Sequence, residues 1–305
     1  MLQVNQLSFS YQSEKTLNSI QFNLERGKHL AIIGESGCGK STLLKLIYGL
    51  HDVDEGSIYW EDTEVLGPKY NLIPGMDFMK YLAQDFDLMP FITVAENVGK
   101  FLSNIYPEKK QARINELLEV VEMIDFANVK AKYLSGGQMQ RVALARVLAL
   151  EPEVLLLDEP FSHIDNFRKN SLRRKIFSYL KDKGITTIIA THDSTDVLSF
   201  ADEVLVMQQG IVVAHERPKD IFEQPKNKYI ASLFDDVNEL ETLSGIELVY
   251  PHQLKVVLNS DLKVQVKKSY YRGNYFLIES YQNENQIFFL HPTEINTNEY
   301  VFLSK

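Results

Sequence analysis

The chain has 305 residues, of which 45% are hydrophobic and 24% charged, as expected for a globular protein long enough to bury a core. Its 41 acidic and 32 basic residues give a net charge of −9, which argues against broad electrostatic binding to nucleic acid. The single cysteine, Cys38, excludes an intramolecular disulfide and fits a reducing compartment. No apolar run approaches the ~20 residues of a membrane helix, and the N-terminus lacks a signal pattern. We therefore expect a cytosolic protein.

The chain begins with two predicted strands, over residues 2–9 and 17–24, joined by a polar loop that carries Tyr11. An exposed tyrosine in such a loop can stack on a planar ring such as adenine, or it can pack on the strands that flank it. The sequence of this region leaves both interpretations open.

A glycine-rich segment, GESGCGKST, follows a short apolar strand and precedes a helix with apolar residues on one side. It matches the phosphate-loop pattern G-x-x-x-x-G-K-[ST] at every fixed position. Its residues are Gly34, Glu35, Ser36, Gly37, Cys38, Gly39, Lys40, Ser41 and Thr42. Backbone N–H groups of such a loop converge on phosphate oxygens, and the helix dipole adds to the attraction. The segment predicts a nucleoside triphosphate site, in which Lys40 contacts the β- and γ-phosphates and Ser41 coordinates Mg²⁺.

Predicted strands and helices continue through the centre of the chain. They are a strand over 78–83, a helical region over 94–128, a helix over 138–150, a strand over 153–157, a basic helix over 166–183, a strand over 185–190, a hairpin of 204–207 and 211–214, and helix and turn over 218–234. Asp158 and Glu159 end an apolar strand, and a charged pair there suits a site outside the carboxyl ends of a parallel sheet. We interpret the basic helix, including Arg173, as a solvent-facing surface.

From about residue 237 the helical periodicity is lost, and short strand-like runs follow. They cover 255–258, 262–266, 275–278, 287–290 and 300–303. Several strands at this spacing suggest a small β-barrel or sandwich.

Five features occur in a set order along the chain. They are the phosphate loop, Gln84 at the end of a strand, the LSGGQ segment over 134–138, the Asp158–Glu159 pair, and His192 after the next strand. Together they resemble the ATP-binding-cassette (ABC) ATPases, the nucleotide-binding subunits of ABC transporters, over residues 1 to about 235. The resemblance implies an α/β core with a mostly parallel sheet, an antiparallel β-subdomain and a helical subdomain over about 91–145.

The resemblance also implies a role for individual residues. Asp158 would hold Mg²⁺, Glu159 would act as the general base or orient the attacking water, and His192 would contact the γ-phosphate of ATP. Gln84 would touch the metal and the attacking water, and Tyr11 would stack on adenine.

In this family one active site needs two chains. Ser135, Gly136, Gly137 and Gln138 form the signature that would close over the ATP of a second copy, head to tail around a two-fold axis. Asp165 would belong to the loop that joins the two sites. The residues before it, His163–Ile164, depart from the small residue and leucine that the family usually has there.

The C-terminal residues indicate the class of ABC protein. Residues 217–234 resemble the end of importer-type ATPases, and 236–305 resemble by position and strand pattern the small all-β barrel (TOBE domain) of iron, sulfate, polyamine and sugar importers. We expect two domains, 1–235 and 236–305, in a homodimeric Mg²⁺-dependent ATPase. It would drive import through membrane-spanning permease subunits at the inner face of the membrane. An exporter ATPase, and a soluble regulatory ABC ATPase whose tail is an interaction module, stay open as alternatives.

Overall fold

A computed structural model describes residues 1–242 and 245–305, except for the side chain of residue 166. The chain forms two compact units, Met1–Pro218 and Lys219–Lys305. The predicted division at 235/236 differs from this one, because two short helices before residue 235 group with the C-terminal unit. As a boundary between family domains, the division at 235/236 stays a prediction.

The first unit contains an antiparallel sheet with the strand order β2-β1-β4-β5. The strands are β1 (Leu2–Ser10), β2 (Lys15–Leu24), β4 (Glu55–Trp60) and β5 (Thr63–Glu64). Burial in β1 and β2 alternates over part of each strand, as at Ile20, Phe22 and Leu24, and is interrupted where the pairing of the two strands shifts register. The strands predicted over 2–9 and 17–24 are confirmed.

A second sheet of the same unit has six strands in the order β10-β9-β3-β8-β7-β6. They are β3 (His29–Ile33), β6 (Met79–Leu82), β7 (Val154–Asp158), β8 (Thr186–Ala190), β9 (Glu203–Gln208) and β10 (Ile211–Glu216). All pairs are parallel except β9–β10, which form the predicted hairpin. Every residue of β3, β7 and β8 is buried, which explains why apolar residues predominate in them. The carboxyl ends of these three strands therefore meet at one edge.

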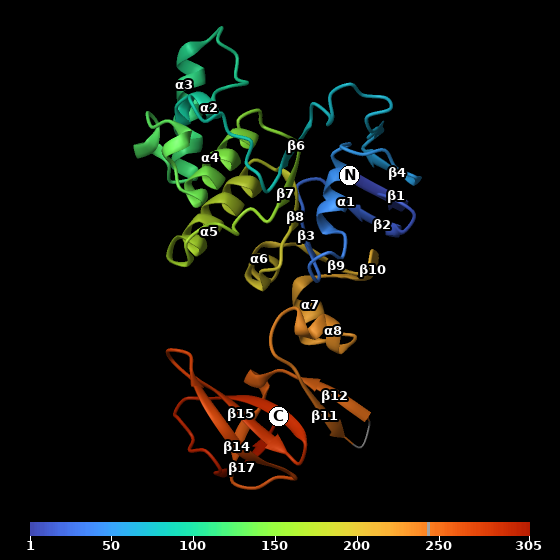
Figure 1. Ribbon diagram of the computed structural model, residues 1–305, viewed down its shortest axis with the longest axis vertical. Coiled ribbons are helices and arrows are strands. Elements are labelled where there is room, and N and C mark those ends of the chain that lie inside the picture. The colour runs from blue at the N-terminus through green and yellow to red at the C-terminus, as the bar shows by residue number, and fades with distance from the viewer. Residues whose placement is uncertain (243–244) are drawn as a thin grey trace. The chain divides into compact units, whose positions relative to one another are not determined.

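The helices of this unit are α1 (Lys40–Ile47), α2 (Val94–Val98), α3 (Pro107–Val120), α4 (Gly136–Leu148), α5 (Asn166–Asp182) and α6 (Ser194–Phe200). Of these, α1, α4 and α6 contact strands of the parallel sheet, whereas α2 and α3 pack on other helices. The apolar side of α1 is fully buried and contacts β7 and β8. In Figure 1, α2, α3 and α4 form one group, separated from the antiparallel sheet by the parallel sheet.

The continuous helical region predicted over 94–128 is wrong in detail. The chain leaves the helix at Gly99 and starts the next one at Pro107, a residue suited to the first helical turn. A Cβ atom at Gly99 would lie 2.5 Å from the Cδ1 of Ile114. The glycine thus permits the close packing of α2 on α3, which the periodicity of the sequence alone does not indicate.

The second unit contains a five-stranded antiparallel sheet with the order β13-β17-β14-β15-β16, beside a separate hairpin. Its elements are α7 (Pro218–Glu223), α8 (Lys228–Ser232), β11 (Asn238–Thr242), β12 (Gly245–Val249), β13 (Lys255–Val257), β14 (Leu262–Tyr271), β15 (Phe276–Gln282), β16 (Asn285–His291) and β17 (Tyr300–Ser304). The sheet curls as an open half-barrel around one apolar core. All five predicted strands are present, and the β11–β12 hairpin is an addition to them.

Candidate active site

The phosphate loop connects β3 to α1, as predicted. A Cβ atom at Gly34 would lie 2.2 Å from the carbonyl oxygen of Met207, and one at Gly39 would lie 2.6 Å from the Cδ2 of Leu17. Gly39, which precedes the first residue of α1, also has a φ of +107°. Side chains at these two positions would displace the loop, so glycine is required there on steric grounds.

Lys40 lies across this loop. Its Nζ donates to the carbonyl oxygens of Gly34 and Glu35 at 2.6 and 3.0 Å. The thiol of Cys38 is buried, and the loop residues from Glu35 to Gly37 are exposed. The ammonium group is therefore held beside an exposed stretch of backbone.

Ser41 and Asp158 come together although 117 positions separate them. The Ser41 Oγ donates to Asp158 Oδ1 at 3.0 Å, and the Tyr81 hydroxyl donates to Asp158 Oδ2 at 3.3 Å. Burial, and then the negative charge of Asp158, raise the pKa of Tyr81, so this hydroxyl stays protonated. Tyr81 was not predicted from the sequence. Its only signal is its position in β6, the strand that pairs with β7.

Glu159 and His192 form a second pair at the same edge of the sheet. The distance between Glu159 Oε1 and His192 Nδ1 is 2.8 Å. The side chain of Glu159 is 17% exposed and that of His192 is 69% exposed, so the pair lies at the surface. Both residues follow the ends of adjacent parallel strands, β7 and β8.

The backbone of Glu159 is strained, with a φ of +51° in a residue that is not glycine. Its N–H donates to the Ala190 carbonyl at 2.9 Å. Its own carbonyl accepts bonds from Gln140 Nε2 at 2.8 Å and Ser162 Oγ at 3.0 Å. These three hydrogen bonds hold a conformation that the isolated chain disfavours, and they direct the Glu159 carboxylate toward His192.

The signature segment lies at the start of α4. The Ser135 side chain accepts from the N–H of Gln138, and the Gln138 side chain accepts from the N–H of Ser135, which together make a capping box. A Cβ atom at Gly137 would lie 2.5 Å from the carbonyl oxygen of His163, whereas one at Gly136 would be no closer than 4.0 Å to the His163 ring. The helix start and the loop before Asp165 are therefore packed directly together.

A cavity of about 440 Å³ opens between these two segments. Its lining includes Ser135 to Gln138, His163, Asp165, Arg141 and Arg168. Among the described residues, none of the phosphate loop lines it. The structure thus joins Asp165 to the signature within one chain, and it places the phosphate loop with Asp158, Glu159 and His192.

The chain is similar to proteins of known family. The family described as "ABC transporter" matches residues 17–162. The sulfate/thiosulfate import ATP-binding protein CysA of Pseudomonas syringae pv. tomato is 33% identical over 263 residues, covering 84% of this chain and 79% of that protein. The chain belongs to the ABC transporter family.

Two further matches support this membership. The spermidine/putrescine import ATP-binding protein PotA of Roseobacter denitrificans is 38% identical over 74% of this chain, which spans only 61% of the length of that relative. A dimeric, post-hydrolysis structure of the ATP-binding cassette MJ0796 bound to ADP and Pi has a TM-score of 0.64. It is 28% identical and covers 72% of this chain and 99% of that chain.

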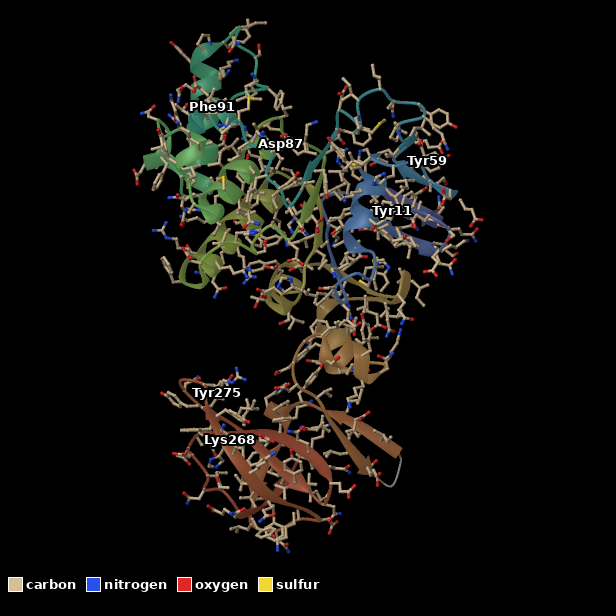
Figure 2. All side chains as sticks on the ribbon, in the orientation of Figure 1. Tyr11, Tyr59, Asp87, Phe91, Lys268 and Tyr275 are labelled. Atoms are coloured by element: carbon tan, nitrogen blue, oxygen red, sulfur yellow. The ribbon has the colours of Figure 1, made fainter. Side chains whose placement is uncertain are left out.

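The remaining two predicted site residues of this ABC chain lie at the margins of the site. Gln84 is exposed, two residues after β6 ends. Tyr11 is 53% exposed; its ring packs edge-on against Phe9 at 4.9 Å, and its hydroxyl lies 3.5 Å from Thr42 Oγ1. Figure 2 shows Tyr11 beside α1. Tyr11 therefore packs on its own strand and also touches the phosphate loop, so its contact with adenine stays a prediction.

The prediction that the basic residues of α5 face solvent is wrong for Arg173. Arg173 does not face solvent: its side chain is 2% exposed and donates to Asp193 Oδ2 at 2.5 Å. Its Nε lies 2.5 Å from Asp196 Oδ1 as an ion pair that is not aligned as a hydrogen bond. Burial opposes the ionisation of Asp193, but hydrogen bonds from Arg173 and Lys169 outweigh it and hold the pKa of Asp193 well below its usual range. Arg173 therefore anchors the segment that carries His192.

Two negative findings concern the residues that the structure describes. Among residues 1–242 and 245–305, no helix has the length and apolar character needed to cross a membrane. The same residues include no group of three or more His, Cys, Asp or Glu side chains arranged to hold a metal ion.

Proposed function

We propose that this chain is the ATP-binding and ATP-hydrolysing subunit of an ABC importer. The observation that carries the proposal is the pairing of Ser41 with Asp158 and of Glu159 with His192 at one edge of the parallel sheet, beside the phosphate loop. Acidic, hydroxyl and imidazole groups that converge next to a phosphate-binding loop suit phosphoryl transfer to water, which depends on positioning and charge stabilisation.

In this proposal the triphosphate of ATP lies on the phosphate loop. Lys40 already reaches the two carbonyl oxygens of its own loop. Phosphate oxygens are stronger acceptors for an ammonium group, so Lys40 turns to the β- and γ-phosphates when ATP binds. The N–H groups at the start of α1 add to the stabilisation of negative charge.

The residues present also fit Mg²⁺. Ser41 and Asp158 place a hydroxyl and a carboxylate oxygen 3.0 Å apart. Mg²⁺ in nucleotide sites prefers oxygen ligands and takes few from the protein, with the others from water and phosphate. A cluster of three acidic or histidine side chains is therefore not needed. When bound, the metal neutralises charge on the β- and γ-phosphates.

Glu159 accepts a hydrogen bond from the attacking water and takes up its proton. The water oxygen forms a bond to the γ-phosphorus, the bond from that phosphorus to the bridging oxygen breaks, and ADP leaves with the electron pair. His192 donates to Glu159 through Nδ1 and, when both of its nitrogens are protonated, donates to the γ-phosphate through Nε2. Gln84 contacts the metal and the same water.

The complete site takes two chains. The cavity between Ser135 and Asp165 is lined by the start of α4 and by two arginines. No phosphate-loop residue of the same chain that the structure describes lines it. We propose that it receives the γ-phosphate of ATP bound to a second copy, in a head-to-tail homodimer. The dimeric form of the similar cassette MJ0796 supports this arrangement.

Membrane-spanning permease subunits are the proposed second partner. The helical subdomain over about 91–145 exposes apolar side chains, among them Phe91, Phe101, Ile105 and Tyr106, which are 61–77% exposed. A cavity of about 420 Å³ lies between α2 and α3. Apolar patches of this kind are typical of interaction sites. Docking there places the chain at the inner face of the membrane, and import is favoured because similar curated proteins are import ATP-binding proteins.

We further propose that residues 1–235 form the ATPase domain and that 236–305 form a TOBE-like domain. A chain lacking residues 237–305 is expected to bind ATP as the full chain does. Loss of ATP binding on this truncation would contradict the division.

The catalytic assignment is tested by Glu159→Gln. This variant should bind ATP normally, hydrolyse it at least a hundredfold more slowly, and accumulate as a dimer in size-exclusion chromatography with light scattering. Glu153→Gln is the matched control, because Glu153 lies just before the opposite end of β7, and it should hydrolyse ATP at the normal rate. Unchanged turnover in Glu159→Gln would remove Glu159 as the catalytic carboxylate.

A further inference from the structure

The loop after Gln84 has an unusual backbone. Phe86 and Asp87 are consecutive residues with φ values of +56° and +45°, and neither is glycine. Side-chain-bearing residues rarely adopt the left-handed region, and two in succession persist only where surrounding contacts hold them. Asp87, labelled in Figure 2, lies on the connection from β6 to α2.

Arg146, near the end of α4, provides part of this support. Its Nη2 donates to the Phe86 carbonyl at 3.0 Å and its Nη1 donates to the Asp87 carbonyl at 2.5 Å. Its guanidinium also pairs with the Asp87 carboxylate at 3.6 Å, and the arginine side chain is only 12% exposed. The strained loop is thus fixed to the helix that begins with the signature.

His163 provides the other support. The Phe86 ring meets the His163 ring edge to face, with centroids 5.3 Å apart and planes at 83°. This geometry is the favourable one for aromatic pairs. His163 stands where the sequence departs from the family's usual residue, so the contact is a feature of this chain.

The backbone of His163 connects the residue to two parts of the proposed site, Glu159 and the signature. Its N–H donates to Gln140 Oε1 at 3.1 Å, and Gln140 Nε2 in turn donates to the Glu159 carbonyl. Its carbonyl oxygen faces Gly137, where a Cβ would approach to 2.5 Å. A movement of the Gln84 loop that displaces the Phe86 ring therefore acts on His163, and through it on Glu159 and on the signature.

We propose that His163 is a positioning residue that couples the Gln84 loop to Glu159 and the signature through its ring contact with Phe86. His163 also lines the cavity beside the signature, but the role proposed here is one of positioning and needs no contact with the ATP on the phosphate loop of its own chain. The inference rests on the proposed roles of Glu159 and Gln84 in hydrolysis. It predicts that loss of the ring contact lowers the rate of hydrolysis and loosens the Gln84 loop, while the affinity for ATP is unaltered.

A double-mutant cycle tests the coupling. His163→Ala and Phe86→Ala should each reduce kcat by about three- to tenfold, the range that an aromatic pair can produce, and leave KM for ATP unchanged. The double variant should be no slower than His163→Ala, because His163→Ala already removes the ring contact together with the bond between His163 Nδ1 and Ser162 Oγ at 3.0 Å. His163→Phe keeps an aromatic edge and should restore most of the rate. Losses that multiply in the double variant, or a His163→Phe variant as slow as His163→Ala, would overturn the proposal.

Amide hydrogen exchange tests the coupling through His163 independently of the proposed role of Glu159 in hydrolysis. In the full chain, His163→Ala should speed amide exchange in residues 84–90, and His163→Phe should not, whether or not Glu159 is the catalytic carboxylate. His291→Ala, which removes a histidine from the C-terminal unit, is the control and should leave this segment unchanged. Equal exchange in wild type and His163→Ala, with an unaltered melting temperature, would refute the coupling even if Glu159→Gln abolishes hydrolysis.

Discussion

Arg173 is a buried cation whose removal has a predictable cost. Its side chain and that of Asp196 are both 2% exposed, and their charged atoms lie 2.5 Å apart. Arg173→Met keeps much of the side-chain volume but removes the charge. Asp196 is then left buried, with the Thr191 hydroxyl at 2.7 Å but without its cation.

Breaking a buried ion pair by removing one partner costs about 3–5 kcal/mol, because the other charge stays desolvated. For a unit of this size, each kcal/mol lowers the melting temperature by about 2–4 °C. The expected decrease is therefore about 6–20 °C. The only tryptophan, Trp60, is buried in the same unit and reports its unfolding by fluorescence.

Lys175→Met on the same helix is the matched control. Lys175 pairs with Glu122 at 2.6 Å, but its side chain is 51% exposed, and such surface pairs contribute about 0–1 kcal/mol. Equal melting temperatures for the two variants would refute the argument from burial.

The loss of stability in Arg173→Met should depend on pH in a direction that the structure defines. Burial raises the pKa of Asp196, and loss of Arg173 raises it further. A carboxyl whose folded-state pKa is raised favours folding while it is protonated, and this contribution is lost as the pH rises through the folded-state pKa. Arg173→Met should therefore differ less from wild type at pH 5 than at pH 8. A deficit that grows toward acid would contradict this account.

Three further predictions concern other parts of the chain. Gly137→Ala should lose about 1–3 kcal/mol of stability by overpacking against the His163 carbonyl, whereas Gly136→Ala, which has room for a methyl group, should melt as wild type does. Ser41→Ala should raise the Mg²⁺ concentration for half-maximal hydrolysis about tenfold by loss of an oxygen ligand, and Ser41→Thr should restore it; an unchanged requirement would exclude Ser41 as a ligand. A hydrogen bond from Tyr270, opposed by burial and reinforced by Lys267, lowers the pKa of Glu279 to about 2. Its stabilising effect is present above the unfolded-state pKa of about 4.3 and lost as the pH falls toward 2, so calorimetry should show a smaller loss of stability between pH 6 and pH 3 in Glu279→Gln than in wild type.

The parts of the site that depend on neighbouring residues could be predicted from the sequence. The phosphate loop, the strand before it and the helix after it are contiguous, and a steric need for glycine and a helix dipole act over a few residues. The burial of β3 and β7 could also be predicted, because strands covered on both faces are mainly apolar. Ser135 and Gln138 could also be placed at the start of a helix, because a helix start depends on residues that are close together in the sequence.

Only the tertiary structure decided which distant residues meet. The bonds from Ser41 to Asp158 and from Glu159 to His192 depend on the order of strands in the parallel sheet, which periodicity does not encode. The basic sequence of α5 suggested a solvated surface, yet Arg173 is buried because two carboxylates of the β8–α6 region compensate its charge. The contact of Phe86 with His163 likewise exists only because two loops, far apart in sequence, are both held by side chains of α4, one by Arg146 and the other by Gln140.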